Sequence, residues 1–154
     1  MNAVLELVDV AATETLAAQL ANSMSAPLIV VFSGEIGAGK TTFIRAMLKA
    51  MGVVVTIKSP TFSLVESYSL PIGQLHHFDL YRIHDASELD YLGFRDYFTP
   101  HAICCIEWPE RANDYFDKID LAFNLIIKGD GRELHAKALS SGGAKILSYL
   151  TGEK

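Results

Sequence analysis

The stretch that decides the fold is Gly34-Glu35-Ile36-Gly37-Ala38-Gly39-Lys40-Thr41, which fills every defined position of the pattern G-x-x-x-x-G-K-[S/T]. The β-branched and aromatic run at residues 28–32 stands directly before it and is typical of a buried strand. Directly after it, residues 41–51 carry apolar side chains at helical spacing. Strand, glycine-rich turn and helix together predict a phosphate-binding loop.

The chemistry of a phosphate site explains the residue types in this loop. Glycines let the backbone approach a ligand closely, so that successive N–H groups can point at an anion. Phosphate would then lie at the positive end of the helix that begins near Lys40. The Lys40 ammonium offers a charge to the β- and γ-phosphates, and the Thr41 hydroxyl is placed to ligate a bridging Mg²⁺. A nucleoside triphosphate with Mg²⁺ is therefore the expected ligand.

Length, composition and charge limit the classes of protein that remain. The 154 residues are 50% hydrophobic and 20% charged, which predicts a single globular domain over residues 1–154. A net charge of -5 argues against a broad nucleic-acid-binding face, so we expect no DNA binding and only indirect contact with RNA. The start carries no signal peptide and the apolar runs are too short to cross a bilayer, so we expect a cytoplasmic protein without membrane association.

The remaining pattern predicts an α/β fold, a P-loop NTPase-like domain whose central sheet is mixed, mostly parallel and flanked by helices. Strands are expected at residues 4–10, 28–32, 62–70, 73–81, 102–106, 119–128 and 132–140, and the turns at 71–73 and 129–131 make two of the pairs β-hairpins. Helices are expected at residues 13–24 with Thr13 as the cap, 41–51, 85–97 with Asp85 as the cap and a break at Gly93, 109–113 and 143–150. The adjacent Cys104 and Cys105 should be buried on opposite faces of a strand.

Two carboxylates are candidates for completing an active site. Glu107 comes directly after the apolar strand at residues 102–106, and Asp79 closes the run at 75–78. Ligands of open α/β sheets bind at the carboxyl ends of strands, where both acids are expected. Glu107 could coordinate Mg²⁺ and activate the attacking water, and either acid could also be a solvated strand end. Which of them would act as the base stays open.

Three further residues are candidates for sensing the nucleotide. Ser59 and Thr61 flank a proline after the loop helix, where P-loop proteins place a switch segment that responds to the γ-phosphate. Trp108 could pack over the loop or simply fill the core. The five histidines lack metal-ligand spacing, and none is assigned to a metal.

Taken together, these motifs resemble the TsaE family (formerly YjeE). The resemblance rests on the phosphate loop, Ser59-Pro60-Thr61-Phe62, His77-Phe78-Asp79-Leu80-Tyr81-Arg82 and Ile106-Glu107-Trp108-Pro109-Glu110, in this order and over nearly the whole chain. It implies an ATPase needed for N6-threonylcarbamoyladenosine at position 37 of tRNAs reading ANN codons, working with TsaB and TsaD and contacting tRNA only through that complex. Hydrolysis is expected to be slow alone and stimulated by the partners.

The resemblance also implies roles for individual residues. ATP phosphates would be bound by Gly37, Ala38, Gly39, Lys40, Thr41 and Thr42. Thr41 and Glu107 match Mg²⁺ positions, Asp79 matches an acid on the nucleotide side, and Lys40, Glu107 and Asp79 form the catalytic set. The segment near Ala12 and the turn at Gly131 fall where the family holds adenine. Glu35 stands where the family often has Asp.

Two alternatives use the same loop. A small-molecule or nucleotide kinase would require an arginine-rich lid, but the arginines are few and scattered. A GTP-binding switch would require N-K-x-D for guanine, which the chain lacks, and a glycine at position 82, where Arg82 stands.

Overall fold

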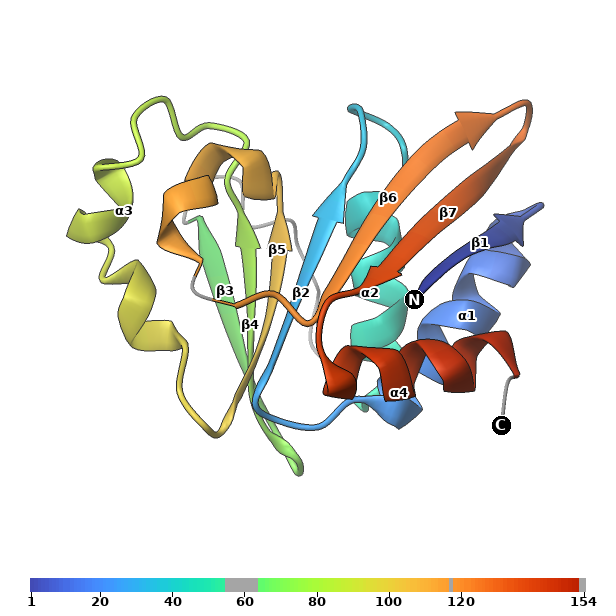
Figure 1. Cartoon of the computed structure of the whole chain (residues 1–154), viewed down its shortest axis with the longest axis horizontal. Helices are drawn as coiled ribbons and strands as arrows, with labels where there is room; N and C mark the ends of the chain where they lie inside the picture. The colour runs from blue at the N-terminus through green and yellow to red at the C-terminus, as the bar shows by residue number, and fades with distance from the viewer. Residues whose placement is uncertain (55–63, 117, 153–154) are drawn as a thin grey trace.

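A mixed seven-stranded sheet organises the computed structural model, which describes residues 1–54, 64–116 and 118–152 (Figure 1). The strands are β1 Asn2–Leu7, β2 Leu28–Ser33, β3 Val65–Leu70, β4 Gly73–Asp79, β5 Ala102–Glu107, β6 Leu121–Lys128 and β7 Gly131–Ala138. The helices are α1 Val10–Ser23, α2 Lys40–Ala50, α3 Glu88–Tyr91 and α4 Ser141–Thr151, with 3-10 turns η1 Phe94–Tyr97 and η2 Pro109–Tyr115. No helix among the described residues is both long enough and apolar enough to span a membrane.

The centre of the sheet is parallel and its edges are antiparallel. The strand order is β1-β7-β6-β2-β5-β4-β3. Strand β2 pairs in parallel with β5 and β6, and β5 pairs in parallel with β4, whereas β3–β4 and β6–β7 are antiparallel hairpins. The predicted mixed sheet with two hairpins is confirmed. Because β2, β4 and β5 are parallel, their carboxyl ends meet at one edge of the sheet.

Each face of the sheet has its own apolar core. Helices α1, α2 and α4 cover one face, where the rings of Phe32, Phe43 and Phe123 pack with centroids 5.4–6.2 Å apart. The η1 and η2 turns and α3 cover β4 and β5 on the other face, where Phe94 packs edge-on against Phe78. Strand β5 is buried along its whole length and therefore presents side chains to both cores.

The two cysteines show this division directly. Cys105 belongs to the core beneath α2 and Cys104 to the opposite core, as the sequence predicts, and both are buried free thiols. Burial raises the pKa of the Cys104 thiol to about 12, so that side chain stays protonated at neutral pH.

Several predicted boundaries are wrong because of local capping. The first helix begins at Val10, three residues before the expected Thr13, since Asp9 Oδ1 accepts a hydrogen bond from the Ala12 N–H at 2.8 Å. This earlier start also ends β1 at Leu7. Helix α3 begins at Glu88 and not at the predicted Asp85 cap, although Glu88 Oε2 still accepts from the Asp85 N–H at 3.3 Å.

Other boundaries move less or cannot be compared. The break at Gly93 between α3 and η1 is confirmed, with φ of 64° at that glycine. The last helix starts at Ser141, capped by the Ser140 hydroxyl, which accepts from the Gly143 N–H at 3.0 Å. The predicted strand at 62–70 is observed from Val65, and its first two residues lie outside the described part of the chain.

Candidate functional site

The glycine loop connects the carboxyl end of β2 to the start of α2. Gly34, Gly37 and Gly39 have φ of 142°, 83° and 104°, values that side chains with a Cβ rarely adopt. A Cβ at Gly34 would also lie 2.6 Å from the Leu125 carbonyl oxygen. Gly39 is the residue that precedes α2, whose first residue is Lys40. The backbone therefore takes the turn that the motif requires, and the helix N-terminus faces the loop.

Lys40 is held inside this loop. Its side chain is only 5% exposed, and its Nζ donates to the carbonyl oxygens of Gly34 and Glu35, the second at 3.0 Å. The same ammonium lies 4.3 Å from the centroid of the Trp108 ring. Burial lowers the pKa of Lys40, while the negative charges of Glu107 and Asp79 oppose that shift. The positive charge thus sits where a phosphate group would enter.

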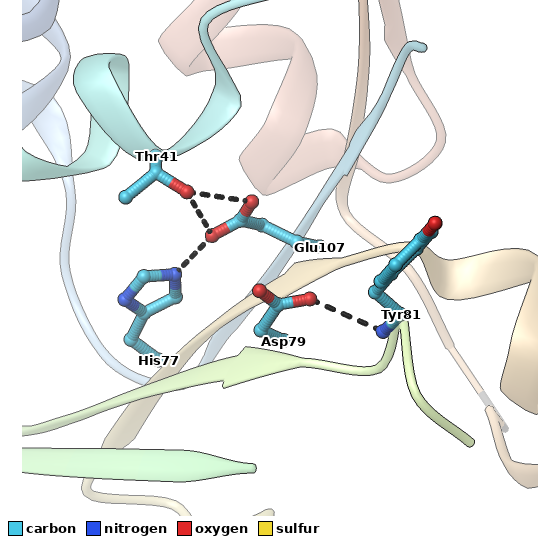
Figure 2. Close-up of polar contacts among 5 residues, drawn as sticks. All are labelled: Thr41, His77, Asp79, Tyr81 and Glu107. Carbon is cyan, nitrogen blue, oxygen red and sulfur yellow. Dashed lines mark hydrogen bonds and ion pairs between the residues drawn. The ribbon is translucent and has the colours of Figure 1, made fainter. Parts of the chain in front are cut away.

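Glu107 and Thr41 meet across the edge of the sheet. The Thr41 hydroxyl, in the first turn of α2, lies 3.0 Å and 3.1 Å from the two carboxylate oxygens of Glu107 (Figure 2). The carboxylate is also 2.6 Å from Nε2 of His77, a residue of β4 that is 1% exposed. The structure therefore brings the two predicted metal positions together, and adds a histidine to which the sequence assigned no role.

Asp79 is next to Glu107 in the sheet and accepts a hydrogen bond from the backbone of a following residue. The two residues are register partners on β4 and β5, and both are buried. Asp79 Oδ1 accepts a hydrogen bond from the Tyr81 N–H at 3.1 Å, as Figure 2 shows. Asp79 nevertheless faces the same cavity as the phosphate loop. This phosphate-side cavity has a volume of about 310 Å³ and is lined by Ile36, Gly37, Gly39, Lys40, Thr41, Thr42, Asp79, Tyr81, Glu107 and Trp108.

Trp108 is positioned by an unusual backbone conformation. Its φ is 59°, uncommon for a large side chain, and its N–H donates to the Phe32 carbonyl at 3.2 Å. The indole packs against the Tyr81 ring at 5.0 Å between centroids, and against Lys40 as described above. It therefore lies over the loop as well as touching the core. The predicted sensors Ser59 and Thr61 lie outside the described residues.

A second cavity lies on the other side of the loop. This base-side cavity has a volume of about 180 Å³ and is lined by Leu7, Asp9, Val10, Thr13, Gly37, Ala38, Gly39, Thr42, Leu125, Asp130, Gly131 and Arg132. Gly131, predicted near adenine, is in its wall. Ala12 is not among the lining residues, because the start of α1 presents Asp9, Val10 and Thr13 there. The two cavities share Gly37, Gly39 and Thr42.

Arg132 is a site residue that sequence reasoning missed. From the second position of strand β7 it donates to the carbonyl oxygens of Ala38 at 3.0 Å and Gly37 at 3.3 Å. It also donates to the Gly131 carbonyl at 2.8 Å. No motif marks this arginine, since its contacts with the loop are to backbone atoms 94 and 95 positions away. Its guanidinium ties the β6–β7 hairpin to the phosphate loop.

His77 was missed for a different reason. It stands two residues before Asp79, so both side chains point to the same face of β4. That alternation was a usable signal, because the neighbouring strand ends in Glu107. Metal-ligand spacing does not mark His77, because this histidine contacts a carboxylate.

The donors in the phosphate-side cavity fit Mg²⁺. The ion takes oxygen ligands and usually binds through one or two carboxylates together with substrate phosphates. Thr41 and Glu107 offer a hydroxyl and a carboxylate within hydrogen-bonding distance of each other, both lining the cavity. In the described part of the chain no group of three or more His, Cys, Asp or Glu residues could hold a metal alone. Nucleotide phosphates would have to complete such a site.

Comparison with known proteins identifies the family. Residues 7–134 match the family model described as threonylcarbamoyl adenosine biosynthesis protein TsaE. The chain belongs to the TsaE family. A relative named tRNA threonylcarbamoyladenosine biosynthesis protein TsaE from Haemophilus influenzae is 40% identical over 79% of this chain and 77% of its own length. A TsaE relative from Rickettsia felis is 32% identical over 90% of this chain and 81% of its own.

A solved structure supports the fold. The crystal structure of YdiB from Bacillus subtilis superposes with a TM-score of 0.84, over 99% of this chain and 95% of that one. The sequence identity is 22%, so this likeness bears on the architecture alone. The predicted α/β fold and the predicted membership of the TsaE family are both confirmed.

Proposed function

We propose that this chain is the ATP-binding and ATP-hydrolysing subunit of tRNA threonylcarbamoyladenosine biosynthesis. The relatives above carry that pathway in their names, and the chain belongs to their family. The substrate is ATP with Mg²⁺, and the tRNA product is N6-threonylcarbamoyladenosine at position 37 of tRNAs reading ANN codons. The chain acts in the cytoplasm with TsaB and TsaD, and meets tRNA only through that complex.

The observation that supports ATP hydrolysis is the placement of Glu107. A strand-end carboxylate hydrogen-bonds the hydroxyl that follows the loop lysine, and both face the phosphate-side cavity. A glycine loop alone explains phosphate binding. Hydrolysis also requires an acid beside the phosphates, and Glu107 supplies one.

Each residue of the site has a role in this proposal. Backbone N–H groups at the start of α2 bind the phosphate oxygens, and the Lys40 ammonium leaves its loop carbonyls to neutralise their charge. Thr41 and Glu107 hold Mg²⁺, which when bound would offset charge on the phosphates. Glu107 or Asp79 orients the attacking water and accepts its proton. Trp108 shields Lys40 from bulk water, which strengthens the interaction of its charge with phosphate.

The expected dependence of hydrolysis on partner proteins follows from the small number of positive charges among the described residues of the phosphate-side cavity. Among the described residues that line the phosphate-side cavity, Lys40 is the one cation. Efficient phosphoryl-transfer sites add further positive charge, often an arginine supplied by another protein. We therefore expect slow hydrolysis by the chain alone and faster hydrolysis in the complex.

Phosphate release tests this proposal. It should be measured for the chain alone, with TsaB, with TsaD and with both, beside a Lys40→Ala chain in the same mixtures. Stimulation by TsaB and TsaD that disappears in Lys40→Ala is the expected result. Equal rates with and without the partners would contradict the proposal, as would release of ADP only when a small-molecule acceptor is added.

A further inference from the structure

We propose that His77 is a positioning residue that fixes the Glu107 carboxylate from inside the sheet, so that the carboxylate faces Mg²⁺ when nucleotide binds. The inference rests on the proposed function and extends it to a residue with no assigned role. Its basis is the 2.6 Å contact between His77 Nε2 and Glu107 Oε2, with both side chains almost fully buried.

The strand register places the two side chains on one face. His77 pairs with Cys105 and Asp79 pairs with Glu107 across the parallel strands β4 and β5. Side chains two residues apart in a strand share a face, so His77 and Glu107 are diagonal neighbours beneath the start of α2. Figure 2 shows the imidazole and the Thr41 side chain reaching the carboxylate from different directions.

The ring's other nitrogen identifies its hydrogen-bonding role. His77 Nδ1 is buried and has no hydrogen-bond partner. A buried N–H group without an acceptor is costly, so a proton on Nδ1 is unfavourable. The ring proton is therefore assigned to Nε2, from which it is donated to the Glu107 carboxylate. The His77 ring therefore donates to Glu107 through Nε2, and its other ring nitrogen has no hydrogen-bond partner.

His77 differs from the other contact of Glu107. Among the described residues, Thr41 and His77 are the side chains that hydrogen-bond this carboxylate. Thr41 is itself a candidate Mg²⁺ ligand, so its oxygen would be shared between the ion and Glu107. His77 lies farther inside, on β4, and can hold the carboxylate whether or not the ion is present. Hydrogen bonds to ligating carboxylates orient them, and their loss costs roughly 10–100-fold in metal affinity or activity.

A matched pair of substitutions separates positioning from packing. Glutamine and methionine have nearly the same length and volume, but only glutamine can donate a hydrogen bond. We would compare His77→Gln and His77→Met with the unsubstituted chain. Calorimetric titration with a non-hydrolysable ATP analogue, with Mg²⁺ and with a chelator, gives the factor by which Mg²⁺ tightens binding. Phosphate release and the midpoint of thermal unfolding would be recorded on the same samples.

His77→Met should reduce the Mg²⁺ enhancement of binding by about tenfold, the lower end of the range for such contacts. Metal-free binding should stay unchanged, because the phosphate loop is intact, and His77→Gln should restore most of the enhancement. Equal losses in the two variants would show that His77 only fills space, and would leave the proposed function standing.

Two further outcomes are informative. Wild-type Mg²⁺ enhancement in His77→Met would also overturn the inference. If the unsubstituted chain binds no nucleotide, the proposed function fails and the inference fails with it. Should His77→Met not fold, His77→Asn replaces it, since the shorter side chain withdraws its donor from Glu107 and should show the same loss.

Discussion

The phosphate-side and base-side cavities lie on either side of one loop but are built in different ways. The phosphate-side cavity is lined by charged and hydroxyl side chains at strand and helix ends, which include Lys40, Thr41 and Glu107. The base-side cavity is enclosed by the β6–β7 hairpin and the start of α1, and Arg132 donates hydrogen bonds there to backbone carbonyl groups of the loop. Hydrolysis should therefore depend on the side chains of the phosphate-side cavity. The residues of the base-side cavity should instead maintain the conformation of the loop.

The largest effect should come from Lys40. Lys40→Ala removes the ammonium that faces the phosphate-side cavity, the one cation among its described lining residues, so we expect hydrolysis to fall to background and ATP binding to be lost or unproductive. Phosphate release and calorimetry measure both. Lys49→Ala, at an exposed position in the last turn of the same helix, is the matched control and should behave as the unsubstituted chain. Wild-type hydrolysis in Lys40→Ala would refute the assignment of the loop.

Glu107 should separate chemistry from binding on the phosphate side. In Glu107→Ala we expect the nucleotide still to bind through the loop, while hydrolysis falls by roughly 10²–10⁴, the usual contribution of an acid–base group. The exposed Glu110 in the next turn gives the control, Glu110→Ala. Single-turnover hydrolysis with saturating ATP measures the step directly. Unchanged turnover would assign the water-activating role to Asp79 or to a partner protein.

The two sides also differ in how far the sequence could predict them. On the phosphate side, the motif fixes Lys40 and Thr41, and the apolar run of β5 locates Glu107 at its carboxyl end. These signals are local, because they depend on residue type and on spacing within a few turns. The contact between Thr41 and Glu107 depends on the parallel pairing of β2 with β5, which the structure shows.

On the base side, such local signals are absent. Arg132 acts on Gly37 and Ala38 through carbonyl groups that every residue has, so its position depends on the hairpin reaching the loop. The start of α1 shifted because Asp9 and Thr13 can both cap a helix, and residue types alone do not rank them. His77 could be predicted in part. The alternation in β4 indicates which face of the strand its side chain occupies, but its hydrogen bond to Glu107 depends on the register between β4 and β5.

A substitution of Arg132 tests whether the base-side cavity affects nucleotide binding by maintaining the conformation of the phosphate loop. Arg132→Met removes the donors to Gly37 and Ala38 and should weaken ATP binding by about tenfold, equivalent to about 1.4 kcal/mol and near the lower end for hydrogen bonds of charged groups. Inorganic triphosphate, which has no base, should lose affinity by a similar factor. Calorimetry with both ligands measures the difference.

The control for this prediction comes from the same hairpin. Lys128→Met removes an exposed cation that contacts Glu133 and not the loop, and should leave both affinities unchanged. If Arg132→Met weakened ATP but not triphosphate, Arg132 would contact the base or ribose. The base side would then recognise ligand directly, contrary to the comparison above.

The smallest effect should come from Glu133 in the base-side hairpin. Lys128 Nζ lies 2.9 Å and His135 Nε2 lies 2.6 Å from its carboxylate, and these two hydrogen bonds hold the pKa of Glu133 at about 2. A pKa lowered by folding stabilises the fold above the unfolded value, and this contribution is lost as the pH falls through the folded value. The stability gap between the unsubstituted chain and Glu133→Gln should therefore close between about pH 5 and about pH 2.

Urea unfolding at several pH values measures that gap, with Glu14→Gln on the exposed face of α1 as the control. Added salt should narrow the gap at every pH, because the lysine partner is exposed and its charge is screened. At neutral pH, Glu133→Gln should hydrolyse ATP at the rate of the unsubstituted chain, since the carboxylate contacts neither the loop nor the phosphate-side cavity. A substantial loss of hydrolysis would mean that the hairpin controls chemistry as well as shape, and the division between the two cavities would not hold.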